Sequence, residues 1–417
     1  MKVLLISSKY APEYAGSGLR AHKTYKRLSE KYNIKFEVIC NSIEFCHSKC
    51  YSFEGVNVTR IYNSPLEKLL GKENNKITHY SKLITKYYAE IYETYKSLKR
   101  REYDVIHTFG NSPSVAAAAY LSSWLRKPMI IELCNIPIDD PHPYLPVASR
   151  FMKASFSNGK VFVAISKQLE KVCNQFGYTK NVWCRPNPIN KSLFYLRTDK
   201  DKYALRERLT PFKPQDKVLT YVAKFVPRKN HIFLINVISR LPCEYKLVLA
   251  GPLVSEGEYK ARDMNCAKKI KNKIIELELE KRVHMHIGQV EMSEYLAMSD
   301  LFLFPSWNEA LGTPMLESLG CGVPVIANVN ESAFRQWIVD NKNGFLCELE
   351  PDKWVEAIKK TDVFAQAERE NIVSDIYRYA SEDIIDKYYY KIIKALTFTG
   401  QNGEININEV LKCTSNE

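Results

Sequence analysis

Two glutamates, Glu309 and Glu317, flank a loop in the stretch FLFPSWNEALGTPMLESLGCGVPVIAN, residues 302–328. The loop residues 311–314 lie where a helix is expected to begin, and the free N–H groups of a helix N-terminus favour an anion such as phosphate. Glu317 would lie about one turn inside the helix, where its carboxylate could accept hydrogen bonds from ligand hydroxyls such as those of a ribose. The alternative is an ordinary charge in a first helical turn, stabilised by the helix dipole.

The segments around the two glutamates predict a strand, a helix and a second strand. The apolar run 301–304 is closed by Pro305 and suits a strand buried on both faces. Thr313 is expected to be the N-cap, with Pro314 at the first helical position, and two glycines should end the helix before the strand 323–327. This β-α-β unit places the loop at the carboxyl end of a parallel strand.

A second group of charged residues follows the apolar run 218–222. Lys224, Arg228 and Lys229 surround a bend in VAKFVPRKNH, residues 222–231. Cations at a strand-to-helix turn can hold a diphosphate and stabilise the charge that develops as it leaves. A basic surface turn would have a similar sequence, so this stretch alone leaves both interpretations open.

Two glycines, Gly16 and Gly18, open a predicted helix near the start of the chain. Residues 16–21, GSGLRA, formally fit the G-x-G-x-x-A pattern of dinucleotide-binding oxidoreductases. Against that class, the glycines come about nine residues after the first predicted strand, and the second strand ends at Cys40 and Asn41 without the acidic residue that would hold a ribose. We therefore interpret the loop as one whose backbone approaches a phosphate or sugar closely.

Metal-binding patterns are weak in this sequence. The run 46–50, CHSKC, has no second ligand pair at the spacing of a zinc site. Asp199 and Asp201 match an acidic triplet that holds manganese in some enzymes, but no apolar strand precedes them. A base-stacking signature of nucleic-acid-binding modules is also missing. We expect neither a metal cofactor nor a nucleic-acid partner.

The composition is that of a folded protein with two domains. The chain has 417 residues, of which 45% are hydrophobic and 26% charged, and two domains of ~200 residues are the natural division. Its 11 cysteines are scattered and odd in number, which indicates reduced thiols. No run of ~18 apolar residues and no signal-peptide core occurs, so we expect a cytoplasmic protein.

The net charge of +13 should attract phosphates, nucleic acid or an anionic membrane. Much of the excess lies in the segment 68–101, where lysines and arginines are interleaved with leucine, isoleucine and tyrosine in a helical pattern. A solvated basic helix would have this pattern. A helix that faces anionic lipid or a lipid-linked substrate would have it too, and the protein would then lie at the inner face of the cell membrane.

Apolar runs alternate with helical stretches in both halves of the chain, which predicts an α/β fold with two open, mostly parallel sheets. The turn-rich segment 185–190 separates the halves. We expect two Rossmann-like, doubly wound domains, residues 1–190 and 191–381, that face each other across a cleft containing the site. The polar tail 398–417 should be loosely ordered.

Together these stretches resemble the retaining glycosyltransferases of family 4, which share the GT-B fold. The resemblance runs over most of the chain, and its most specific part is the E-x7-E block with Glu309 and Glu317 in the two glutamate positions. Supporting stretches are the Gly16 and Gly18 loop, residues 163–166, 187–190, the Lys224 and Lys229 turn, 250–252 and 343–346.

The resemblance implies roles for these residues. Glu309 would contact the donor sugar, while Lys229 and Lys224 would hold the diphosphate, and we group these three as catalytic. Glu317 would bind the nucleotide ribose. The remaining residues expected to bind substrate are Gly16, Gly18, Arg228, Leu311, Gly312, Thr313, Pro314 and Asn135.

The resemblance also implies an activity. The first domain would bind the acceptor and the second the donor, with a helix at 382–397 crossing back to the first. The implied reaction is a metal-independent transfer, with retention, of a hexosyl unit from a nucleotide-diphosphate sugar, a UDP-sugar being favoured. The acceptor would be a glycan or lipid-linked glycan in surface polysaccharide, lipopolysaccharide or capsule biosynthesis.

The chain departs from the family at three positions. Lys224 stands where the family usually has arginine, Asn135 follows Cys134 where many members carry a histidine near the donor sugar, and Asn190 replaces an aspartate. These changes bear on the identity of the donor. Two alternatives of other kinds are a nonhydrolysing sugar-nucleotide epimerase of the same fold and a catalytically silent scaffold that binds a sugar nucleotide.

Overall fold

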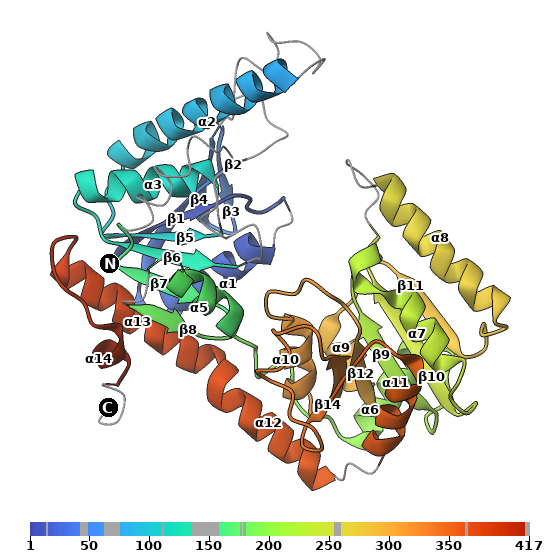
Figure 1. Cartoon of the computed structure of the whole chain (residues 1–417). Coiled ribbons are helices and arrows are strands. Elements are labelled where there is room, and N and C mark those ends of the chain that lie inside the picture. The colour runs from blue at the N-terminus through green and yellow to red at the C-terminus, as the bar shows by residue number, and fades with distance from the viewer. Residues whose placement is uncertain are drawn as a thin grey trace. The chain divides into compact units, whose positions relative to one another are not determined.

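The computed structural model describes residues 1–13, 16–41, 49–61, 76–110, 112–134, 158–175, 177, 181–253, 260–362 and 366–412. The chain divides into two compact units, Met1–Arg185 with Ile385–Glu417, and Pro186–Ile384. Each unit contains one sheet with helices on both of its faces (Figure 1).

The first unit is built on an eight-stranded sheet in the order β3-β4-β2-β1-β5-β6-β7-β8. Its described strands are parallel, except that β3 and β4 pair antiparallel at one edge. Strand order reverses between β1 and β5, which is where doubly wound sheets bind ligands. The strands are β1 (Lys2–Ser7), β2 (Lys35–Asn41), β3 (Lys49–Phe53), β4 (Val56–Ile61), β5 (Val105–Phe109), β6 (Met129–Leu133), β7 (Val161–Ala164) and β8 (Val182–Cys184).

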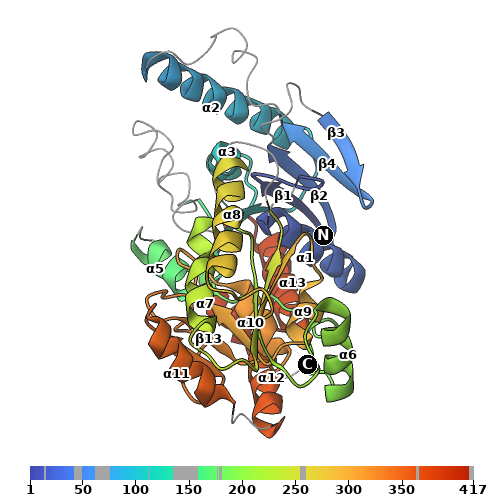
Figure 2. The same cartoon turned by 90° about the vertical axis from the view of Figure 1, so that its right-hand side faces the viewer.

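Helices cover both faces of this sheet, with α2 and α3 on one side and α1 and α13 on the other (Figures 1 and 2). Strand side chains point alternately to the two faces, so Val3 and Leu5 enter the core that also contains Tyr25 of α1 and Tyr389 of α13. The helices are α1 (Gly16–Tyr32), α2 (Lys76–Lys99), α3 (Pro113–Trp124), α5 (Lys167–Gln175), α13 (Glu382–Thr399) and α14 (Ile407–Lys412).

A buried polar network joins α13 to the sheet. Arg185 donates to Oε1 of Glu132 at 2.9 Å, and the Tyr389 hydroxyl donates to the same carboxylate. His107 Nε2 lies 3.4 Å from the other oxygen of Glu132. Burial alone would raise the pKa of Glu132, but Arg185 and His107 lower it to about 2. Helix α13 is therefore held to the first unit by the hydrogen bonds of Tyr389 as well as by apolar packing.

The expectation of a loosely ordered tail is wrong for the part of it that the structure describes. Residues 407–412 form α14, and its Ile407 is buried in the core of the first unit. The Ile407 N–H donates to Asn181 Oδ1 at 3.0 Å. Apolar residues at Ile405, Ile407 and Val410 give the polar tail one face that packs, which its overall composition conceals.

The second unit contains a six-stranded, fully parallel sheet in the order β11-β10-β9-β12-β13-β14. All four residues of β12 are buried, as its uniformly apolar sequence predicts for a central strand. The strands are β9 (Lys217–Val222), β10 (Tyr245–Gly251), β11 (Val283–Ile287), β12 (Leu301–Phe304), β13 (Val325–Asn328) and β14 (Gly344–Cys347).

Two layers of helices also cover the second sheet (Figures 1 and 2). Helices α7, α8 and α11 lie on one face, and α9, α10 and α12 lie on the other with α6 beside α9. The helices are α6 (Asp199–Leu209), α7 (His231–Ile238), α8 (Lys260–Glu276), α9 (Met292–Ala297), α10 (Thr313–Gly320), α11 (Pro351–Thr361) and α12 (Gln366–Ala380). Within the described ranges, no helix is both long and apolar enough to cross a membrane.

Candidate active site

The two charged loops singled out from the sequence follow neighbouring strands of the second sheet. Strand order reverses between β9 and β12, so the loops after these strands separate at a topological switch point. Lys224, Arg228 and Lys229 follow β9, and Glu309 follows β12. Residues about eighty positions apart in the sequence therefore meet at one edge of the sheet.

The loop after β9 is a tight turn. Pro227–Lys229 forms a short 3-10 helix, and Asn230 adopts a left-handed conformation with φ of 53° before α7 begins. The Arg228 carbonyl accepts the N–H of Trp307 at 3.2 Å, which joins this turn to the loop after β12. Backbone geometry thus brings the basic turn against the loop that carries Glu309.

Glu309 receives hydrogen bonds from two cations. Arg228 Nη1 donates to Glu309 Oε1 at 2.9 Å, and the Lys229 ammonium donates to the same oxygen. The side chains of Lys229 and Glu309 are each only 11% exposed, whereas that of Arg228 is 47% exposed. Arg228 can therefore contact a ligand from the solvent side, while Lys229 and Glu309 lie deeper in the protein.

Three positive charges gather at this turn and influence one another. The pKa of Lys229 is lowered, mainly by burial and further by Arg228 and Lys224, although Glu309 opposes the change. The pKa of Lys224 is lowered by burial and then by Arg228. An anion placed among these side chains would remove much of their mutual repulsion, which suits a phosphate group.

The start of α10 differs by one residue from the prediction. Gly312, not Thr313, is the N-cap, and it adopts a left-handed conformation with φ of 77°. A Cβ at Gly312 would lie 2.7 Å from the Phe334 ring, so only glycine fits there. Thr313 is the first residue of the helix and does not cap it. Its Oγ1 accepts a hydrogen bond from Asn187 Nδ2 at 2.7 Å.

The other residues that were predicted to bind substrate here differ in how deeply their side chains are buried. Leu311 is buried, so only its backbone can serve a ligand, while Thr313 and Pro314 are half-buried at the helix N-terminus. Glu317 is half-buried and lies one helical turn after Thr313 on the same side of α10. This placement is compatible with the predicted contact to ribose hydroxyls.

Gly16 and Gly18 begin α1 in the first unit, after β1. A Cβ at Gly18 would lie 2.4 Å from the carbonyl oxygen of Lys9, so this glycine is needed for the helix to approach its own preceding loop. Gly16 has open space around its Cα. Of the two glycines, Gly16 is the one whose backbone a ligand can approach.

Several sequence predictions fall outside the described residues. Asn135, predicted to bind substrate, lies there, as do Cys46 and His47 of the weak metal pattern and Lys68 and Lys72 of the basic segment. Among residues that the structure describes, no group of three or more His, Cys, Asp or Glu side chains is arranged to hold a metal ion. Asp199 and Asp201 begin α6, where Thr198 caps the helix through the N–H of Asp201.

Sequence reasoning missed Glu331, which follows β13. Its side chain is buried, and Oε2 accepts the backbone N–H of Glu309 at 3.0 Å. In the sequence it looks like one more glutamate in a polar turn. One signal could have identified it. Glu331 follows the strand next to β12, and the carboxyl ends of neighbouring parallel strands lie at the same edge of a sheet.

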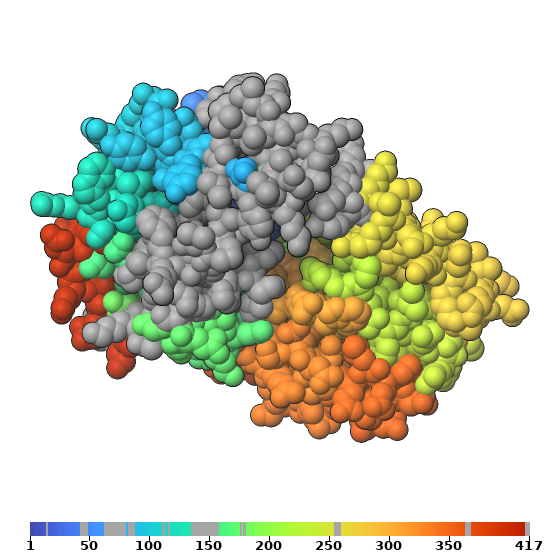
Figure 3. Space-filling view, turned by 45° about the horizontal axis from the view of Figure 1, so that its top comes forward, coloured from blue at the N-terminus to red at the C-terminus, as the bar shows by residue number. Residues whose placement is uncertain are grey.

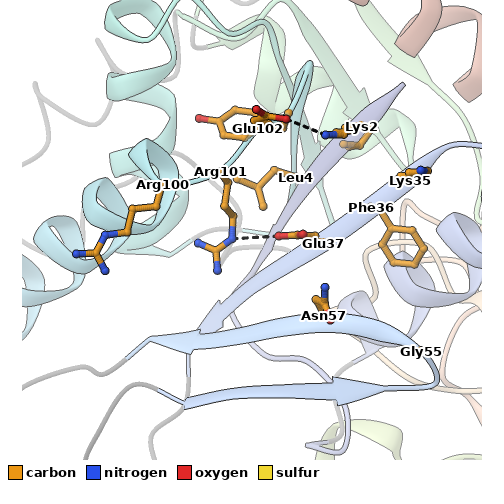
Figure 4. A pocket seen from close by; sticks show the side chains of 12 residues that line it. Lys2, Leu4, Lys35, Phe36, Glu37, Gly55, Asn57, Arg100, Arg101 and Glu102 are labelled. Carbon is orange, nitrogen blue, oxygen red and sulfur yellow. Dashed lines mark hydrogen bonds and ion pairs between the residues drawn. The ribbon is translucent and has the colours of Figure 1, made fainter.

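A cavity of about 440 Å³ lies elsewhere, in the first unit (Figure 4). Its lining includes Lys2 and Lys35, the first residues of β1 and β2, and also Arg100 and Arg101. Two of these cations form ion pairs, Lys2 with Glu102 and Arg101 with Glu37. It therefore lies at the amino-terminal edge of the first sheet. The loops that carry the predicted residues follow the opposite ends of their strands.

Residues 206–362 match the family model described as Glycosyl transferases group 1. The second unit contains a Glycosyl transferases group 1 domain. This matched segment includes Lys224, Lys229, Glu309 and Glu317, so the site described above lies within the group 1 domain.

Curated relatives match parts of the chain. TuaC of Bacillus subtilis, named as a teichuronic acid biosynthesis glycosyltransferase, is 28% identical over 55% of this chain and 55% of its own length. A Campylobacter jejuni enzyme is 29% identical over 33% of this chain and 34% of its own length. Its name is N-acetylgalactosamine-N,N'-diacetylbacillosaminyl-diphospho-undecaprenol 4-alpha-N-acetylgalactosaminyltransferase. The chain thus spans about half or less of the length of these relatives.

A solved structure matches much more of the chain than these sequences do. HepE from Anabaena, crystallised with UDP, superposes with a TM-score of 0.72 over 95% of this chain and 100% of its own, at 16% identity. The predicted α/β GT-B fold with two Rossmann-like sheets is confirmed.

Proposed function

We propose that the chain is a retaining glycosyltransferase that moves a hexosyl unit from a nucleotide-diphosphate sugar to a glycan or lipid-linked glycan acceptor. The observation that carries the proposal is the contact of Arg228 and Lys229 with Glu309 at the switch point of the group 1 domain. A site that places cations beside a carboxylate can bind both parts of a diphosphate that is joined to a sugar. The cations meet phosphate oxygens, and the carboxylate accepts hydrogen bonds from sugar hydroxyls.

In the proposed reaction, Lys224 and Lys229 hold the diphosphate and stabilise the negative charge that grows on it as the bond to the sugar breaks. The acceptor hydroxyl attacks the anomeric carbon from the face that the diphosphate leaves, and a phosphate oxygen takes the hydroxyl proton. The new bond therefore has the configuration of the old one. Glu309 orients the sugar, and Glu317 binds the ribose of the nucleotide. No metal is required in this scheme, because lysines supply the positive charge.

The curated relatives and the structural neighbour favour particular classes of donor and acceptor. HepE is a structural neighbour crystallised with UDP, which favours a UDP-sugar as donor here. The Campylobacter relative is named for a diphospho-undecaprenol acceptor, and TuaC is named for teichuronic acid biosynthesis. We therefore propose that the acceptor is a lipid-linked glycan bound by the first unit, and that the product belongs to a surface polysaccharide.

A contact with the anionic inner face of the membrane is part of this proposal. Four aromatic side chains on α2 and α3, here called the aromatic face, are exposed: Tyr88 is 68%, Tyr92 60%, Tyr120 53% and Trp124 65% exposed. The Tyr95 and Trp124 rings, 5.8 Å apart, join the two helices, and part of each helix is visible on the surface of the first unit (Figure 3).

Cations border the aromatic face. Lys99, Arg100 and Arg126 are exposed at the C-terminal ends of α2 and α3. Tryptophan and tyrosine favour the interface between lipid headgroups and acyl chains, and lysine and arginine are attracted to anionic lipid. This combination supports peripheral membrane contact through α2 and α3.

The first experiment measures thermal stability of the purified chain with UDP, GDP, ADP and CMP, followed by sugar conjugates of any nucleotide that binds. A ligand at 100 times its dissociation constant should stabilise the protein by roughly 2.7 kcal/mol. Transfer is then followed with the donor so identified, a lipid-linked acceptor and added EDTA. Retained anomeric configuration and activity in EDTA are expected. An inverted product, a 2-epimer of the donor, or binding without any transfer would each refute the proposal.

A further inference from the structure

Glu331 occupies an unusual position next to the proposed active site. Its carboxylate accepts the N–H of Glu309 at 3.0 Å, and its side chain is buried. Its own backbone is ordered by two turns, since its N–H donates to Asn328 and its carbonyl accepts from Phe334, each at 3.1 Å. A second contact between the same two loops runs from Asn328 Nδ2 to the Ser306 carbonyl at 3.3 Å.

The segment that Glu331 holds contains a residue in a left-handed conformation. Asn308, immediately before Glu309, has a φ of 58°, in a region that asparagine adopts more readily than most other residues with a side chain. The bond from the Glu309 N–H to Glu331 fixes the peptide that follows Asn308, and thereby the direction in which the Glu309 side chain leaves the backbone.

Placing Glu331 here carries a cost in free energy. Burial raises its pKa, the charge of Glu309 adds to the rise, and the backbone N–H groups of Glu309, Ala333 and Asn308 oppose it. A second carboxylate beside Glu309 is thus tolerated, but it does not suit a loop selected for stability alone. A requirement for accurate placement of Glu309 accounts for it.

We infer that Glu331 is a positioning residue, which fixes the backbone of Glu309 so that the Glu309 carboxylate stays against Arg228 and Lys229 and faces the donor sugar. The inference rests on the proposed function, because it assumes that Glu309 meets the sugar. Glu331 itself acts through the main chain. Its removal should therefore affect the sugar half of the donor and spare the nucleotide half, which Glu317 is proposed to bind.

The test compares Glu331→Ala and Glu331→Gln with the wild-type chain. Glutamine keeps an oxygen that can accept the Glu309 N–H, and alanine does not. A matched control is Glu356→Ala, which removes an exposed glutamate from α11 of the same unit. For each variant we would measure kcat and KM for the UDP-sugar, the dissociation constant of UDP without sugar, and the thermal midpoint.

We expect Glu331→Ala to lower kcat at least tenfold while the UDP dissociation constant stays within twofold of wild type. Glu331→Gln should recover kcat to within threefold, and Glu356→Ala should match wild type. Unchanged kcat in Glu331→Ala would overturn the inference while leaving the proposed function intact. Parallel losses of UDP affinity, thermal midpoint and kcat would show a purely structural role. A wild-type chain that transfers no sugar would remove the proposed function, and the inference with it.

Discussion

The Lys229 ammonium donates to Oε1 of Glu309, eighty residues further along the chain. The proposed phosphate contact and the proposed sugar contact are therefore linked by a direct ion pair. A diphosphate that accepts hydrogen bonds from Lys229 must share this donor with Glu309. Binding at the phosphate end of the donor should thus influence how the carboxylate holds the sugar end.

This link leads to a prediction for Lys229→Ala. Because leaving-group charge grows toward the transition state, the loss should be greater in turnover than in ground-state binding. We expect kcat to fall roughly 100-fold and the dissociation constant of the donor to rise less than about tenfold. Lys359→Ala in α11, which removes an exposed lysine, is the control. An unchanged kcat would exclude the proposed role.

The Glu317→Ala variant tests the ribose contact. Hydrogen bonds from ligand hydroxyls to a carboxylate contribute roughly 1.5–3 kcal/mol each, so we expect UDP to bind between about tenfold and 100-fold more weakly. The half-buried position of Glu317 should leave the thermal midpoint nearly unchanged. Calorimetric titration with UDP measures the effect, and equal affinity in variant and wild type would remove the ribose assignment.

The glycines at the start of α1 should respond differently to alanine. In Gly18→Ala the new Cβ would meet the Lys9 carbonyl oxygen at 2.4 Å, whereas in Gly16→Ala it would meet open space. We expect Gly18→Ala to destabilise the protein by roughly 1–3 kcal/mol, as overpacking does. Gly16→Ala should leave stability within about 0.5 kcal/mol of wild type. Urea unfolding followed by circular dichroism compares the pair, and equal stability would contradict the close approach.

The buried network around Glu132 predicts acid sensitivity. The folded-state pKa of Glu132, about 2, lies below its ordinary value of 4.5, so the folded state is stabilised above pH 4.5 and loses this stabilisation as the pH falls toward 2. The effect is on the order of 3 kcal/mol. We expect Glu132→Gln to be less stable than wild type at pH 7 and to lose less stability on acidification.

The control for this experiment is Glu102→Gln, because the Glu102 side chain is 90% exposed. Its unfolding free energy should follow the wild-type dependence on pH. If Glu132→Gln also followed that dependence, Glu132 would not be the group responsible. Tyr389→Phe, which removes a hydroxyl that donates to Glu132, should have a smaller effect in the same direction.

The aromatic face of α2 and α3 predicts binding to vesicles. Burying one aromatic side chain yields roughly 1.5–3 kcal/mol, so Trp124→Ser should weaken binding to phosphatidylglycerol vesicles by about tenfold or more. Added salt should weaken wild-type binding because the bordering cations attract the lipid. Tyr203→Ser, at a 41% exposed tyrosine in α6, is the control. Equal binding by Trp124→Ser and wild type, as measured by co-sedimentation, would exclude this face.

Much of the fold could be predicted from local patterns. The run 301–304, closed by Pro305, and the glycines after α10 predict β12, α10 and β13 because each signal acts on its nearest neighbours. The predicted cap of α10 at Thr313 is wrong by one residue, because Gly312 is the N-cap in a left-handed conformation and the Phe334 ring leaves no room for a Cβ there. The lack of room beside Gly312 comes from Phe334, a residue distant in the sequence, and so could not be read from the local pattern.

The contacts within the site could not be predicted in the same way. Lys229 and Glu309 meet because β9 and β12 are neighbours in the sheet, and strand order is not encoded in either segment alone. Glu331 reaches Glu309 across another pair of neighbouring strands. The residue types were evident from the sequence, but their partners depend on how distant segments are arranged.

The first unit is made of two separate pieces of chain, whereas the second is one continuous piece, Pro186–Ile384. During synthesis the ribosome releases the whole continuous piece before Tyr389, Ile392 and Leu396 of α13, which belong to the core of the first unit. We therefore expect the half that is translated first to reach its native state last. A nascent chain stalled before Tyr389 would carry a complete second unit and an incomplete first unit, which chaperones and proteases could reach until the rest of α13 is made.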